Sequence, residues 1–155
     1  FVLTLGGRHD WLDTKLDNIL KPANSQDTNV SHFSGRVGLI YLFDNGISPY
    51  VSYSTSFAPN SGRSFTGEYF EPSEGEQIEL GVKYAPTDIN LAINAALFNI
   101  EQTNTLASDP DNIGFSVTRG KVRSRGFEIE AKTSLADGLD LTAAYTYLDP
   151  EILEG

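Results

Sequence analysis

The sequence of 155 residues contains no cysteine and no methionine, and it has one tryptophan and two histidines. Without cysteine, neither a disulfide framework nor a cysteine-ligated zinc site can form. Cations are also scarce, because 11 Lys and Arg stand against 21 Asp and Glu and give a formal net charge of −10. Nucleic acid is therefore excluded as a partner, since binding phosphates requires clustered Lys and Arg.

Long hydrophobic runs are absent as well. No stretch of about 18 apolar residues occurs, which excludes a transmembrane helix. Residues 1–12 lack the basic, apolar and small-residue segments of a signal peptide. Phe1 opens inside an alternating apolar run and no methionine occurs. We therefore expect the chain to be a piece of a longer protein.

What the sequence does contain is a period of two. In residues 47–57, ISPYVSYSTSF, one set of alternate positions is mainly apolar and aromatic and the other is mainly serine. Such alternation indicates strands with two chemically different faces. The same pattern recurs in residues 1–11, 33–43, 77–84, 89–97, 127–132 and 139–147. It predicts an all-β protein of about seven long strands.

The connections between these strands differ systematically in length. Short turns are expected at 44–46, 86–88 and 135–138, and long polar connections at about 16–30, 58–74 and 104–113. Asp44-Asn45-Gly46 is a typical tight hairpin turn, because Asn and Gly accept positive φ. Short and long connections therefore alternate, which predicts an antiparallel up-and-down meander with the short turns at one end.

Aromatic residues are expected in two bands, one near each end of the strands. Those near the short turns are Tyr41, Phe43 and Tyr84, and those toward the long loops are Trp11, Tyr53, Phe57, Tyr145 and Tyr147. Aliphatic residues lie between the bands, a pattern typical of a transmembrane β-barrel wall with a polar lumen side. A soluble antiparallel sheet packed on a core alternates too. Strands of about ten residues favour the wall, because soluble strands usually have five or six.

Four stretches carry a resemblance to a known family: LTLGGRHDW, VGLIYLFDNGISPYVSYSTSF, GEQIELGVKYAPTD and VRSRGFEIEAKTSLADGLDLTAAYTYLD. They resemble the barrel of TonB-dependent siderophore receptors of the ferrichrome (hydroxamate) type, over about residues 2–149. The resemblance implies that residues 1–155 are a partial segment of a transmembrane β-barrel of about 22 strands.

The same resemblance implies a location and a function. The whole protein would lie in the outer membrane of a Gram-negative bacterium and import ferric siderophores. Its energy would come from the TonB complex through an N-terminal plug domain that is missing from this chain. No enzymatic activity, cofactor or metal site is implied. The family's ligand contacts lie on the plug and on other strands, so none is transferred to residues of this chain.

The loop at 58–74 is the candidate ligand site. It combines Arg63, Phe65, Tyr69 and Phe70 with glycines. Aromatic side chains and one cation could capture an iron–hydroxamate complex, whose exterior is partly apolar. Alternatively, these side chains pack the loop against its neighbours.

Arg123 and Arg125 share the parity of Phe127 and are therefore expected on the outer, lipid-facing side. A buried charge at the bilayer midplane costs about 2–4 kcal/mol. Either this part of the strand rises above the membrane, or a bulge near Gly120 or Gly126 reverses the parity. Above the membrane, the arginines could face phosphates of outer-leaflet lipid or lipopolysaccharide.

Other polar groups have plain explanations. Glu128 and Glu130 could do acid/base work, but lumen-facing carboxylates matched by Lys132, Lys83 or Arg36 are the simpler interpretation. His9 is expected beside Trp11 at the membrane interface, and His32 has no metal-ligand spacing. Segment 108–114, SDPDNIG, lacks most ligands of a calcium loop.

Two further classes remain open at this point. One is a soluble all-β module that binds carbohydrate, and the other is a hydrolytic barrel or all-β glycosidase that uses Glu128 and Glu130. Seven strands cannot close a wide barrel, so both edges would carry unpaired backbone groups. We therefore expect the isolated piece to self-associate through its strand edges.

Overall fold

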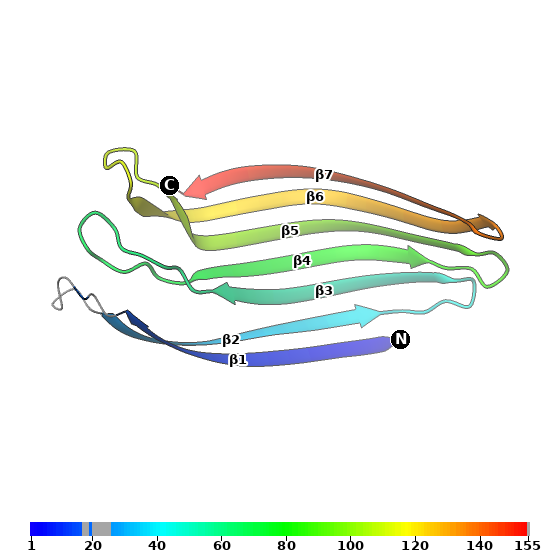
Figure 1. Ribbon diagram of the computed structural model, residues 1–155. Helices are drawn as coiled ribbons and strands as arrows, with labels where there is room; N and C mark the ends of the chain where they lie inside the picture. The colour runs from blue at the N-terminus through cyan, green and yellow to red at the C-terminus, as the bar shows by residue number, and fades with distance from the viewer. Residues whose placement is uncertain (17–18, 20–25, 155) are drawn as a thin grey trace.

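The computed structural model describes residues 1–16, 19 and 26–154 as one antiparallel sheet of seven strands in the order β1-β2-β3-β4-β5-β6-β7 (Figure 1). Every strand pairs with its sequence neighbour, so the predicted up-and-down meander is confirmed. The strands are β1 (Val2–Leu16), β2 (Gln26–Ile40), β3 (Ile47–Ala58), β4 (Ser73–Tyr84), β5 (Leu91–Ser108), β6 (Ser116–Ala136) and β7 (Leu139–Glu154).

The strands are longer than the apolar alternation indicates. β2 already begins at Gln26, and β5 continues to Ser108. The predicted bounds of the connections at 16–30 and 104–113 are therefore wrong, because both predictions include residues that belong to strands. Polar residues such as Gln102 and Thr103 still pair across the sheet, because an antiparallel ladder is held by backbone groups whatever the side chains. The connection after β1 falls largely outside the described residues.

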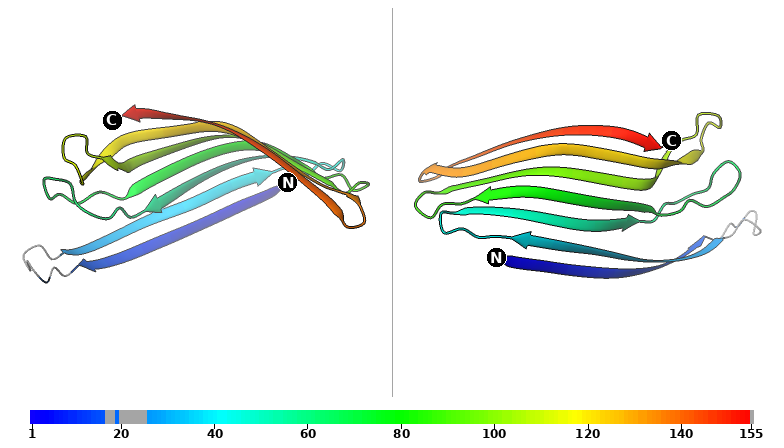
Figure 2. Two further views of the ribbon diagram at one scale, coloured as in Figure 1. Left: turned by 45° about the horizontal axis from the view of Figure 1, so that its top comes forward. Right: turned by 180° about the vertical axis from the view of Figure 1, so that it is seen from behind.

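The sheet is a single curved layer (Figure 2). Neither a helix nor a second sheet covers either face within the described residues. No helix of that part of the chain could span a bilayer. Ala96 is the one buried hydrophobic residue found there. Leu80 and Leu141 lie under no other layer of the described residues and are 58% and 52% exposed.

One row of paired residues crosses all the strands on what we call the outer face. Each of its side chains is apolar or aromatic and at least 40% exposed. The row consists of Leu3, Leu39, Val51, Leu80, Leu97, Phe127 and Tyr147. An apolar band of this width on open protein surface requires a non-aqueous neighbour.

The opposite, inner face is mixed rather than uniformly polar. On β3 and β4 it carries the expected hydroxyl and carboxylate groups, such as those of Ser52 and Glu79, which are paired. On β5–β7 it also carries apolar side chains toward the long-loop end, a feature that the sequence pattern missed: Phe98, Ile100, Val122, Leu148 and Ile152.

Two glycines of the inner face give room to large neighbours. A Cβ on Gly126 would lie 2.6 Å from Cζ of Phe98 and would also meet the carbonyl oxygen of Tyr147. A Cβ on Gly81 would lie 2.6 Å from the hydroxyl oxygen of Tyr50. The rings of Phe98 and Tyr50 therefore occupy the space that a Cβ on these two positions would need.

The short turns have the expected glycines, but of Asn45 and Gly46 only Gly46 takes the positive φ that was expected of both. Gly46 adopts φ 84° and Gly138 φ 80°. The backbone N–H of Phe43 donates to the carbonyl of Ile47 (3.0 Å), and Asn45 Oδ1 accepts from the N–H of Ile47 (3.2 Å). These turns lie at one end of the sheet, and the connections 59–72 and 109–115 lie at the other (Figure 1).

Candidate functional site

The connection 59–72 folds into a small hairpin of its own. Arg63 and Tyr69 form a β-bridge, and the N–H of Ser64 donates to the carbonyl of Glu68 (2.9 Å). Gly67 supplies the positive φ of 87° at the tip. The bridge places the guanidinium carbon of Arg63 4.2 Å from the centre of the Tyr69 ring, a cation–π arrangement.

This hairpin meets the connection 109–115. The rings of Phe65 and Phe115 pack edge to face with their centres 5.3 Å apart. Between the two connections lies a cavity of about 320 Å³, lined by Ser64, Phe65, Thr66, Glu68, Tyr69, Phe70, Asp109, Asn112, Val117 and Thr118. Of the four candidate residues, Phe65, Tyr69 and Phe70 line the cavity, and Arg63 lies against Tyr69.

Asp109 holds the second connection in its turn. Its Oδ1 accepts from the backbone N–H groups of Asp111 (2.9 Å) and Asn112 (3.1 Å), and its Oδ2 accepts from Asn112 Nδ2 (2.9 Å). Hydrogen bonds from the Asn112 amide and the Asp111 backbone hold the pKa of this carboxyl below its ordinary value. The carboxylate is thus occupied in forming a solvated turn, the interpretation preferred over a calcium loop.

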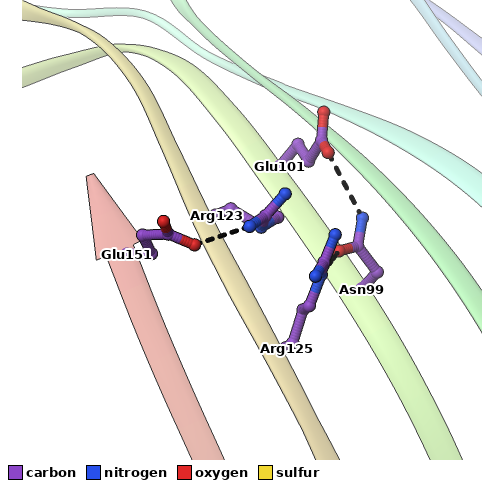
Figure 3. Close-up of polar contacts among 5 residues, drawn as sticks. All are labelled: Asn99, Glu101, Arg123, Arg125 and Glu151. Atoms are coloured by element: carbon purple, nitrogen blue, oxygen red, sulfur yellow. Dashed lines mark hydrogen bonds and ion pairs between the residues drawn. The ribbon is translucent and has the colours of Figure 1, made fainter. Parts of the chain in front are cut away.

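Polar and charged side chains form a band on the outer face of β5–β7, at the end of the sheet where the connections 59–72 and 109–115 lie. We call it the charged band; its residues are Asn99, Glu101, Lys121, Arg123, Arg125 and Glu151, and Figure 3 shows all of them except Lys121. Arg123 pairs with Glu151 (2.5 Å), and Arg125 Nε donates to Asn99 Oδ1 (2.9 Å). Lys121 pairs with Glu101 (2.5 Å). The Lys121 ammonium lowers the pKa of Glu101, and the Glu101 carboxylate raises the pKa of Lys121. These residues follow directly after the apolar row on the same face.

The ladder decides between the two explanations for Arg123 and Arg125. β6 pairs with β7 without interruption from Val122 to Ser134, and the register shifts lie outside that span. No register shift occurs near Gly126. The shift at Lys121/Val122 lies beside Gly120, on the far side of Arg123 from Phe127, so it does not change the face of either arginine. Both arginines share the outer face with Phe127, which favours a strand that rises above the membrane.

The carboxylates of β6 do not form a catalytic pair. Glu128 and Glu130 stand two residues apart on the inner face rather than across a cleft. Lys132 pairs with Glu130 (2.8 Å), as expected. Lys83 instead lies 5.4 Å from the Tyr50 ring centre, and Tyr50 donates to Glu79 (2.6 Å).

The histidines take part in ring contacts. His9 lies 4.2 Å from Trp11 between ring centres, the neighbour that was expected. His32 stacks on Phe57 at 4.4 Å, and its Nδ1 is 3.6 Å from Glu74. In the part of the chain that the structure describes, no three acidic or imidazole groups gather as metal ligands.

Comparison with known proteins agrees with this geometry. Residues 1–154 match the family model described as TonB dependent receptor-like, beta-barrel. The chain is 44% identical over 151 residues to the ferrichrome outer membrane transporter/phage receptor of Escherichia coli K12, covering 97% of this chain and 20% of that protein. It is 42% identical over 147 residues to the ferrioxamine B receptor of Salmonella typhimurium, covering 94% and 20%.

Solved structures show the same fold. The ferripyoverdine receptor of the Pseudomonas aeruginosa outer membrane superimposes with a TM-score of 0.71 at 27% identity, over 96% of this chain and 20% of that one. The ferric preacinetobactin receptor of Acinetobacter baumannii gives 0.69 at 28% identity, over 99% and 23%.

The chain spans about a fifth of the length of these curated relatives. They are transporters and receptors rather than enzymes, so the hydrolase and glycosidase alternatives find no support. The chain belongs to the TonB-dependent receptor family, as a segment of its outer-membrane β-barrel from a Gram-negative bacterium.

Proposed function

We propose that this chain is a wall segment of an outer-membrane receptor that imports ferric siderophores of the hydroxamate class. In the whole protein, a plug domain within the barrel couples uptake to the TonB complex. The observation that carries the proposal is the aromatic cavity between the two connections, at the end of a wall whose outer face is apolar from β1 to β7. The ferrichrome and ferrioxamine B receptors among the relatives support the ligand class.

The cavity suits a contact on the surface of a ferric hydroxamate. Such a complex wraps the metal in oxygen ligands and presents partly apolar groups outward. The rings of Phe65, Tyr69 and Phe70 offer apolar contact, and Ser64 and Thr66 offer hydroxyl groups beside them. The cavity volume of about 320 Å³ lies at the lower end of the range for small-molecule sites. We therefore assign the cavity to first capture, with further contacts supplied by other parts of the receptor.

Arg63 contributes through Tyr69. Its guanidinium lies over one side of the Tyr69 ring, and so fixes the ring in the orientation that lines the cavity. Removing either group should loosen the hairpin and weaken capture.

The experiment uses the complete receptor with Arg63→Ala and Tyr69→Ala. We expect each to weaken binding of ferrichrome or ferrioxamine B about tenfold, the effect of losing one well-packed contact. Ile113→Ala is the control, because Ile113 is 98% exposed and does not line the cavity. Unchanged affinity for both ligands in both variants would exclude the capture role.

The charged band of the outer face belongs to the headgroup layer in this proposal. Arg123 and Arg125 would lie among the phosphates of outer-leaflet lipid or lipopolysaccharide, with Glu151 and Asn99 holding their side chains in place. Neutralising both arginines should reduce co-purification of lipopolysaccharide with the receptor. Unchanged lipid association would remove this part of the proposal.

The edges of the sheet bear on the isolated chain. Within the described residues, β1 pairs with β2 alone and β7 with β6 alone. Their outer backbone groups need partners, which neighbouring strands supply in the whole barrel. Expressed alone, the chain should self-associate through these edges, a state that sedimentation would detect as oligomers. A stable monomer in aqueous buffer would contradict this.

A further inference from the structure

A buried hydroxyl stands where the β3–β4 connection rejoins the sheet. Ser73, the first residue of β4, is 7% exposed, and it is the one buried polar residue found among the described positions. Its Oγ lies 2.9 Å from the carbonyl oxygen of Asn104 and 3.3 Å from Asn60 Oδ1. A hydroxyl has one proton, so the shorter contact to Asn104 is its principal hydrogen bond.

The strand that receives this bond is locally distorted. Asn104 has φ 55°, the one positive value for a non-glycine residue in the described chain, and it lies inside β5. The β5–β6 ladder runs through Thr103 and Thr105 and leaves Asn104 out. Asn tolerates this region better than most residues because its side chain can hydrogen-bond locally. Here Asn104 Nδ2 donates to the carbonyl of Pro72 (3.1 Å).

Asn60 completes the arrangement from the other end of the connection. Its Nδ2 lies 2.6 Å from the carbonyl oxygen of Glu71 and 2.7 Å from that of Asn104. The start of the connection is therefore bonded both to its end and to β5. Surface loops whose ends lie close together in this way form compact units.

We propose that Asn60, Ser73 and Asn104 form a polar latch that positions the β3–β4 connection over the wall, and with it the ligand cavity. The latch fixes the base of the hairpin, and the Phe65–Phe115 contact joins its tip to the neighbouring connection. With both held, Phe65, Tyr69 and Phe70 face the cavity before any ligand arrives. Such preorganisation raises affinity because less ordering accompanies binding. This inference rests on the proposed capture function for its effect on ligand affinity, but not for its effect on loop position.

Four variants of the complete receptor test the latch. Ser73→Ala and Asn60→Ala remove bonds to the Asn104 carbonyl. Asn104→Gly keeps the positive φ and the backbone acceptor and removes only the amide, whereas Asn104→Ala also strains the backbone. The matched control is Ser134→Ala, which removes one hydroxyl hydrogen bond (to Asp140, 2.6 Å) at the opposite end of the sheet.

The first readout is loop position without ligand. Spin labels at Thr66, on the hairpin, and at Asp149, on β7, report the distance between hairpin and wall in receptor embedded in lipid. Wild type and Ser134→Ala should give the same narrow distribution. Ser73→Ala and Asn60→Ala should broaden it about twofold, since a released loop samples more positions. Asn104→Gly should broaden it less than Asn104→Ala.

The second readout is affinity for ferrichrome and ferrioxamine B, measured on unlabelled protein. We expect about tenfold weaker binding in Ser73→Ala and Asn60→Ala, with a thermal midpoint matching that of Ser134→Ala. If Ser73→Ala and Asn60→Ala both gave distance distributions as narrow as wild type, the latch would be overturned. Broadened distributions with unchanged affinity would leave the latch standing and refute capture by this loop. If Asn60→Ala does not fold, Ser73→Ala, which removes only the hydroxyl, and Asn104→Gly, which removes only the side-chain amide, give the same decision.

Discussion

The two faces of the sheet share one backbone but differ in how uniform their side chains are. On the outer face, the row from Leu3 to Tyr147 is apolar on every strand. The next row toward the long loops is apolar at Tyr53 and Ile78 and carries charge on β6 and β7, at Arg125 and Asp149. On the inner face, Ser52 and Glu79 share a row with Phe98. The difference indicates that one uniform solvent selected the outer side chains, whereas particular neighbours selected the inner ones.

The largest effect is expected from a charge placed on the outer face. Ala95→Arg puts a cation on an outer position of β5 two rows before Asn99, where the charged band begins, with Val82 and Ile129 as its paired neighbours. In lipid this should cost about 2–4 kcal/mol of unfolding free energy. Asn94→Arg on the inner face of the same strand, opposite Glu130, should cost far less. Urea unfolding of the complete receptor in lipid vesicles measures both, and equal losses would erase the distinction between the faces.

A smaller effect is expected from filling an inner-face glycine. Gly126→Ala would bring a Cβ to 2.6 Å from Phe98 and against the Tyr147 carbonyl. Backbone must shift, so we expect a loss of about 1–3 kcal/mol. Gly38→Ala is the matched variant, because its Cβ would stand 3.6 Å from Ser52 Cβ, an ordinary contact. Thermal unfolding of both should separate them, and a neutral Gly126→Ala would show that the wall does not need this space.

Within the charged band the effects should be smaller still. Arg123 and Glu151 pair at 2.5 Å, with Glu151 57% exposed. A double-mutant cycle with alanine at both positions should give a coupling of about 0.2–1 kcal/mol. A coupling above about 2 kcal/mol would mean that the pair is shielded from water, contrary to a place in the headgroup layer.

The smallest effect is the pH dependence of the Glu101–Lys121 pair. The pKa of Glu101 is lowered, so its contribution is present above its ordinary value of 4.5 and is lost as pH falls through the folded value. The pKa of Lys121 is raised, so its contribution is present below 10.5 and is lost as pH rises further. The free energy of unfolding of the complete receptor, measured across pH, should be slightly higher between pH 4.5 and 10.5 than outside that window. The Glu101→Gln variant should lack this rise. Identical pH profiles would contradict the pairing.

The alternation of side chains made the faces predictable. A period of two leaves only two orientations, so Arg123 and Arg125 could be assigned to the outer face before their ladder was seen. The strand ends were not predictable, since Gln102 and Thr103 carry no alternation and pair through backbone alone. The sequence did not predict that Phe98 and Leu148 are apolar side chains of the inner face, because the other residues of that face are partly polar and partly apolar.

The candidate site was only half predictable. Composition identified Arg63, Phe65, Tyr69 and Phe70 as a loop with aromatic and cationic side chains. The sequence does not predict the contact between Phe65 and Phe115, because it depends on the relative positions of the connections 59–72 and 109–115 in space. The bent backbone at Asn104 was equally hidden, since asparagine within a strand is not in itself a signal of positive φ.

The most direct test of the two-sided wall is a scan of β5 with spin labels in the complete receptor in lipid. Each residue from Ala92 to Asn99 is labelled in turn, and its accessibility to oxygen, which concentrates in hydrocarbon, is compared with that to a water-soluble nickel complex. Oxygen should dominate at residues 93, 95 and 97 and not at their neighbours, and the preference should end at residue 99. Accessibility that does not alternate along these residues would contradict a wall with one face in lipid.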